Sequence, residues 1–166
     1  MKQLCLLSSV VPLVLLASCA APTAGSRVSD AEPGTVAYDR DVFQTLLGNH
    51  ELIRREFRDV EGGIESVTES DNAEVAALIQ DHVAAMKVRI ENGYRIRMWD
   101  PMFREIFDNA DKIRMTFENT AKGVKVREVS DDPYVARLIQ AHAKVVSGFV
   151  ERGSAESQLA HEPPAR

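Results

Sequence analysis

Residues 130–153 read SDDPYVARLIQAHAKVVSGFVERG, and a related stretch, SDNAEVAALIQDHVAAMKVRIENG, occupies residues 70–93. The two stretches lie 60 positions apart, and their similarity extends beyond them without a gap. Residues 43–93 and 103–153 share 16 identities in 51 positions. Identity at one fixed offset indicates an internal duplication. Two copies are too few for a solenoid, so we expect a single pseudo-two-fold domain.

Each of the two stretches has the apolar periodicity of a long helix. The helix face consists of Val75, Ile79, His82, Met86 and Ile90 in the first copy and of Val135, Ile139, His142, Val146 and Val150 in the second. Spacings of three and four residues place such side chains on one side of a helix. The Asp/Asn pairs at 71–72 and 131–132 are candidate N-caps, and Gly93 and Gly153 are suitable C-terminal stops.

The segment before each long helix predicts a short helix and a β-hairpin. In the second copy Ile113, Met115 and Phe117 alternate with polar residues, which is typical of a half-buried strand. The same alternation in the first copy puts Arg55 on the apolar face, so we expect that strand at an edge or rim. A glycine-containing loop joins the two strands of each hairpin.

The sequence therefore predicts an α+β fold made of two tandem αββα repeats, residues 39–93 and 99–153. Two hairpins pair most economically into one four-stranded antiparallel sheet, with both long helices on one face. The short helices are expected to cover an edge or an end of this sheet. Residues 154–166 contain two prolines and are predicted to be a disordered tail, in which His161 is solvated.

The N-terminus has the order of an export signal: a lysine at position 2, an apolar stretch over residues 4–16, small residues and a cysteine. The last four positions read Leu16-Ala17-Ser18-Cys19. They resemble the lipobox of bacterial lipoproteins. The resemblance implies that residues 1–18 are a signal peptide and that Cys19 is acylated with lipid such as palmitate.

A lipid at Cys19 would anchor the protein to a membrane of the cell envelope. Ala20 follows the cysteine, which resembles the outer-membrane default, facing the periplasm, of Gram-negative lipoproteins. Residues 19–38 are mostly small or polar and are predicted to be a flexible tether between the anchor and the domain. The only other cysteine, Cys5, lies in the signal peptide, so residues 20–166 offer no disulfide, cysteine zinc site or thiolate nucleophile.

Composition and motifs exclude several classes of function. The net charge is −5 and no basic run stands out, which argues against a nucleic-acid partner. The sequence has no GxSxG, HExxH, P-loop or GxGxxG motif. A non-catalytic role is therefore favoured, although the question of enzymatic activity stays open.

The main candidate for a binding site is the pair His82 and His142, which occupy the same position of the two repeats. If the long helices pack side by side, the two imidazoles would approach each other and could bind haem iron or a transition metal. Met86 lies one turn after His82, and a thioether beside an imidazole suits copper(I). His50 is a further candidate nitrogen ligand, although its repeat counterpart, Ala110, is not a ligand.

The alternative is that both histidines only pack the core and that the lipoprotein has a structural or protein-interaction role. Its partner would be another envelope protein, docked on the sheet or on the connector formed by residues 94–99. Trp99 in this connector is expected to pack over the sheet edge more readily than to form a binding platform. A third hypothesis is a pH sensor, because buried histidines can titrate near neutrality.

Overall fold

The computed structural model describes residues 31–166, so the predicted signal peptide, Cys19 and tether residues 19–30 lie outside the described residues. The first repeat contains α1 (Val36–Gly48), the 3-10 turn η1 (His50–Leu52), β1 (Ile53–Val60), β2 (Gly63–Ser70) and α2 (Ala73–Asn92). The second contains α3 (Pro101–Asp108), η2 (Ala110–Lys112), β3 (Arg114–Thr120), β4 (Gly123–Val129) and α4 (Pro133–Arg152). A short helix, α5 (Ser154–Ser157), follows. This order confirms the predicted αββα repeat.

The four strands form one antiparallel sheet in the order β1-β2-β4-β3. The hairpins meet at the centre, where β2 pairs with β4. In this pair Ser66 lies opposite Val126, and these two residues hold the same position in the two repeats. The pseudo-two-fold axis therefore passes between them, and β1 and β3 are the edges of the sheet.

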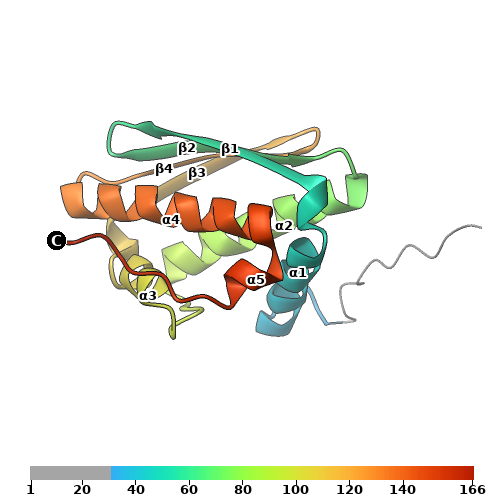
Figure 1. Cartoon of the computed structure of the whole chain (residues 1–166), viewed down its shortest axis with the longest axis horizontal. Helices are drawn as coiled ribbons and strands as arrows, with labels where there is room; N and C mark the ends of the chain where they lie inside the picture. The colour runs from blue at the N-terminus through green and yellow to red at the C-terminus, as the bar shows by residue number, and fades with distance from the viewer. Residues whose placement is uncertain (1–30) are drawn as a thin grey trace, which may run out of the picture.

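One face of the sheet is covered by α2 and α4 (Figure 1), as the sequence predicted. The core between sheet and helices includes the buried residues Ile64, Val124, Val126, Ile79 and Ile139. The short helices pack against the long ones, α1 on α2 and α3 on α4. The expectation that they cover an edge or end of the sheet was therefore wrong: their apolar faces are buried under the helical layer instead.

Side-chain caps and glycines fix the ends of the long helices. Asn72 accepts hydrogen bonds from the backbone N–H groups of the first turn of α2, and Asp132 does the same for α4. At the other end Gly93 has a φ of 68° and Gly153 a φ of 55°, a region that side chains other than glycine seldom adopt.

The other member of each predicted capping pair has a different partner. Asp71 accepts a 2.7 Å hydrogen bond from Arg54, and Asp131 accepts one of the same length from Arg114. Both arginines project from the solvent side of the sheet, as the strand pattern predicted. The same surface ion pair thus connects the residue before the N-cap of each long helix with the first strand of its own repeat.

Each long helix is also attached to the hairpin of the other repeat. The side-chain amide of Gln80 in α2 donates to the carbonyl oxygens of Thr120 and Gly123, at 3.0 and 3.2 Å. Gln140 in α4 donates in the same way to Gly63, at 3.4 Å. Accordingly α4 packs over β1 and β2, whereas α2 packs over β4, β2 and β3. The two repeats are interlocked rather than placed side by side.

The ends of the described chain differ from expectation. The predicted tether includes the first residues of α1, which starts at Val36 behind an N-cap at Thr35. Residues 154–166, predicted to be a disordered tail, include α5 and then run back along α4 toward α3 (Figure 1). No helix among residues 31–166 is long and apolar enough to span a bilayer.

Candidate functional site

Two imidazoles occupy equivalent positions on the two long helices, His82 on α2 and His142 on α4. Both are half-buried. His82 stacks on Phe43 of α1, with ring centroids 5.6 Å apart and an interplanar angle of 21°. His142 meets Phe103 of α3 edge to face, at 5.1 Å and 83°. Phe43 and Phe103 are themselves equivalent, so each repeat pairs its histidine with the same phenylalanine position, although the ring geometry differs.

The two contacts are joined through a third phenylalanine on α4. Phe149 lies 5.5 Å from Phe43 and 6.2 Å from Phe103, measured between ring centroids. The structure therefore gathers His82 and His142 into one aromatic cluster, in which three phenyl rings link them. Within residues 31–166 the two imidazoles make no ring contact with each other.

Both imidazoles are kept in the neutral form. Burial lowers the pKa of His82 to about 4, an effect that Asp39 opposes and Arg89 reinforces. Burial also lowers the pKa of His142 to about 4, and the nearby charge of Arg55 lowers it further. With pKa values of about 4, both rings stay uncharged in the folded chain near neutral pH, so these values do not support a sensor that works by charging a histidine of the folded domain.

Neither imidazole has a hydrogen-bond partner in the described part of the chain. Nδ1 of His82 is buried without one. Buried polar groups usually have partners, so each exception calls for an explanation. A neutral imidazole with a free nitrogen is also the form in which histidine binds a metal.

The two assisting residues are placed differently. Met86 is half-buried one helical turn after His82, as its spacing predicted. His50 lies in η1, where its Nδ1 donates to the carbonyl oxygen of Val150 at the end of α4, at 2.9 Å. That contact gives His50 a structural role. Among the described residues, no group of three or more histidine, cysteine or acidic side chains is arranged to hold a metal ion.

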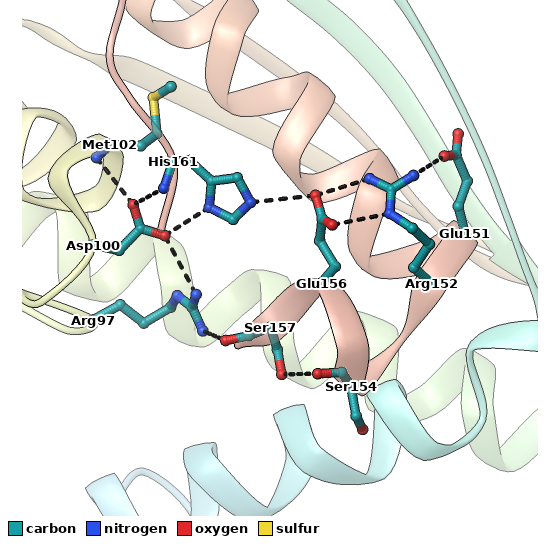
Figure 2. A network of polar contacts seen from close by, with 9 residues as sticks. All are labelled: Arg97, Asp100, Met102, Glu151, Arg152, Ser154, Glu156, Ser157 and His161. Carbon is teal, nitrogen blue, oxygen red and sulfur yellow. Dashed lines mark hydrogen bonds and ion pairs between the residues drawn. The ribbon is translucent and has the colours of Figure 1, made fainter. Parts of the chain in front are cut away.

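Besides the aromatic cluster, the structure contains a polar cluster that was not predicted from the sequence. His161 lies between two acidic side chains (Figure 2): its Nδ1 is 2.7 Å from Asp100, and its Nε2 is 3.2 Å from Glu156. Glu156 also pairs with Arg152, at 2.9 Å. The side chain of His161 is only 14% exposed, so the prediction of a solvated tail residue was wrong.

Arg97 connects this polar cluster to the aromatic one. Its guanidinium donates to the carbonyl oxygen of Ser157, at 3.0 Å, and lies 4.7 Å from the ring centre of Trp99. It also lies 4.9 Å from the ring centre of Phe103 and 5.3 Å from that of Phe149. Trp99 is 55% exposed, stacked on an arginine rather than packed over the sheet edge as expected. The connector, the tail and the helical layer therefore form one unit.

Opposing effects act on the carboxylates of the polar cluster. Burial by itself would raise the pKa of Asp100, but hydrogen bonds from His161 and from the backbone of Met102 outweigh it, and the net shift is downward. Hydrogen bonds from Arg152 and His161 likewise hold the pKa of Glu156 below its usual range. Both acids are therefore ionised at neutral pH.

The chain matches no protein-family model, no curated protein and no solved structure.

Proposed function

We propose that this protein is a membrane-anchored envelope lipoprotein whose domain binds haem or a transition metal, without catalysis, through His82 and His142. The observation that carries the proposal is the state of these two imidazoles. They hold equivalent positions in the repeats, they are neutral, and neither has a hydrogen-bond partner among the described residues. A buried polar atom left without a partner costs about 1–3 kcal/mol, and a bound ligand would remove that penalty for His82.

The surroundings of the imidazoles suit soft or apolar ligands. Three phenylalanine rings connect the two imidazoles through direct ring contacts. Haem binds in apolar surroundings with histidine as an axial ligand, and copper(I) accepts imidazole together with thioether. Met86 supplies the thioether on the side of His82. His50 is left out of the proposed ligand set because its ring is hydrogen-bonded at the end of α4.

The test uses the full-length chain, extracted in detergent and purified without a histidine tag. An absorption spectrum and elemental analysis are recorded before and after addition of haemin or copper(I). We expect a Soret band, or metal at about one equivalent per chain. His82→Phe and His142→Phe should each abolish binding, since phenylalanine keeps the aromatic packing but has no nitrogen.

His50→Ala is the matched control. It removes a histidine outside the aromatic cluster and should leave binding intact even if stability falls. Normal binding by both phenylalanine variants would exclude the proposed ligands. A wild-type chain that remains free of metal and haem after both additions would exclude the function itself.

The second candidate is an interaction lipoprotein in which the histidines only pack the core. The observation that favours it is the close ring contact of each histidine with a phenylalanine. The exposed aromatic residues Tyr94 and Trp99 in the connector would then face an envelope partner. This candidate is supported if the chain binds neither haem nor metal and if replacing either histidine with alanine destabilises the domain.

The anchor is tested separately. Cys19→Ala should abolish incorporation of radiolabelled palmitate and move the protein from the membrane to the periplasmic fraction. Cys5→Ala is the control, because that residue lies in the predicted signal peptide. Unchanged membrane association of the Cys19 variant would contradict a lipid anchor at this position.

A further inference from the structure

Arg55 is a cation on the helix-covered face of the sheet. One of its terminal nitrogens, Nη1, donates to the hydroxyls of Thr68 and Ser66 on the neighbouring strand, at 2.8 and 3.2 Å. Its Nε is buried without a hydrogen-bond partner. Burial lowers the pKa of the guanidinium, and the charge of Glu128 on β4 offsets this effect only in part.

The two solvent-facing arginines of the same strand are paired. Arg54 lies 2.7 Å from Asp71, and Arg58 lies 2.6 Å from Glu65. Arg55 has no such ion pair within the described chain. A buried charge without a counter-ion is strongly unfavourable, whereas exposed pairs contribute little. The charge of Glu128 on β4 acts on Arg55 from a distance, but no carboxylate among the described residues is hydrogen-bonded to this guanidinium.

A surface pocket of about 430 Å³ opens at this position, between β1 and the C-terminal half of α4. It is lined by Arg55, Glu56, Phe57, Ser147, Val150 and Glu151. Its volume lies in the range of small-molecule sites. Apolar side chains, a hydroxyl and a guanidinium that has no hydrogen-bonded carboxylate thus share one pocket, while the two glutamates are exposed at its rim.

We propose that this pocket binds a small organic monocarboxylate, with the carboxylate held by the guanidinium of Arg55. The planar fork of arginine matches a carboxylate, and Nη2 of Arg55, which unlike Nε is not enclosed, has no hydrogen-bond partner among the described residues. Phe57 and Val150 would contact the apolar body of the ligand. The rim carboxylates of Glu56 and Glu151 disfavour a second negative charge, which selects against dianions such as phosphate.

The site belongs to the first repeat alone. The residue equivalent to Arg55 in the second repeat is Met115, and the residue equivalent to Thr68 is Glu128. The duplicated scaffold therefore tolerates methionine at this strand position. The inference does not rest on haem or metal binding by the histidines, and either can fail without the other.

The test measures calorimetric binding and the thermal unfolding midpoint of the full-length chain in detergent, with benzoate as the probe at constant ionic strength. Benzoate should bind and raise the midpoint, whereas its neutral isostere benzamide should do neither. Arg55→Met should weaken benzoate binding at least about tenfold. Arg54→Met, which alters the exposed neighbour, should leave the affinity unchanged.

A second variant keeps the test independent of folding at position 55. Val150→Trp fills the pocket from the α4 side, retains the guanidinium, and should also abolish benzoate binding. Benzoate that has no effect on the wild type, or that binds Arg55→Met as well as the wild type, would overturn the proposal. Phosphate that binds as tightly as benzoate would overturn the assignment to monocarboxylates.

Discussion

Nδ1 of His161 lies 2.7 Å from Oδ2 of Asp100, a carboxylate with no solvent-exposed surface. The other oxygen of Asp100 accepts hydrogen bonds from the backbone nitrogens of Met102 and His161, each at 3.1 Å. One buried side chain therefore caps α3 and holds the C-terminal segment. Residues near His161 are therefore part of the domain, because they supply hydrogen bonds to the ionised carboxylate of Asp100.

Replacing His161 with alanine should destabilise the domain by about 2–3 kcal/mol, because the variant removes a charge-assisted hydrogen bond from a buried carboxylate. Urea unfolding at pH 7 measures this change, provided that the dependence on urea concentration stays constant. Glu162→Ala is the matched control, since the next residue is exposed and should change stability little. A loss below about 0.5 kcal/mol for the His161 variant would mean that the tail does not stabilise the fold.

Stability should fall as the pH is lowered from about 6.5 to about 4. His82 and His142 have pKa values of about 4 in the folded chain, against 6.5 for a free imidazole, so in this window the unfolded chain binds more protons. The loss should be on the order of 2–3 kcal/mol for each ring. Urea unfolding at pH 7.5, 5.5 and 4.5 measures it.

The double variant His82→Phe, His142→Phe should show a much flatter pH dependence in that window. Below about pH 4 stability should continue to fall as the pH is lowered, for a different reason. The pKa values of Asp100 and Glu156 are lowered in the folded chain, so protonation of these two acids favours the unfolded chain. The acid loss should therefore persist in the double variant. An unaltered slope between pH 6.5 and 4 would show that other groups cause it.

Gly123 is predicted to be intolerant of any side chain. Its φ is 156°, and a Cβ at this position would lie 3.0 Å from the Cα of Glu69 and closer still to the carbonyl oxygen of Thr68. Gly123→Ala should therefore cost more than about 2 kcal/mol at the central strand pair. Gly48→Ala is the opposite case, because nothing lies within 4 Å of its Cβ position and the helix gains propensity. Equal stabilities of the two variants, measured by thermal unfolding, would contradict this account.

Local and periodic features of the fold could be predicted from the sequence. The repeat, the antiparallel sheet and the two long helices on one face follow from a fixed offset and from spacings of two and of three to four residues. Asn72 caps the start of α2 and Gly93 caps its end, as their residue types indicate. The placement of Arg55 on an edge strand was likewise foreseeable, because an arginine in an apolar alternation must reach solvent or a ligand.

Contacts between distant segments could not be predicted in the same way. Asp100 and His161 are 61 residues apart, and neither has a local pattern that points to the other. Asp100 matches a simple N-cap, and His161 lies two residues before Pro163 and Pro164, in a tail whose composition is typical of disorder. The row of phenylalanines that links His82 to His142 depends on three helices meeting, which periodicity within one helix does not show. The lipid anchor at Cys19 remains a prediction.

The interlocked repeats should not fold as separate units. Each long helix covers strands of the other hairpin, and Gln80 and Gln140 are hydrogen-bonded across the repeat boundary. A fragment of residues 95–166 would expose β4 as an unpaired edge and leave α4 without β1 and β2. We expect this fragment to be unfolded, or to be a dimer in which a second copy replaces the missing repeat. Circular dichroism and size-exclusion chromatography distinguish these states, and addition of a fragment of residues 31–94 should restore one folded heterodimer. A stable folded monomer of the isolated fragment would show that the contacts across the boundary are dispensable.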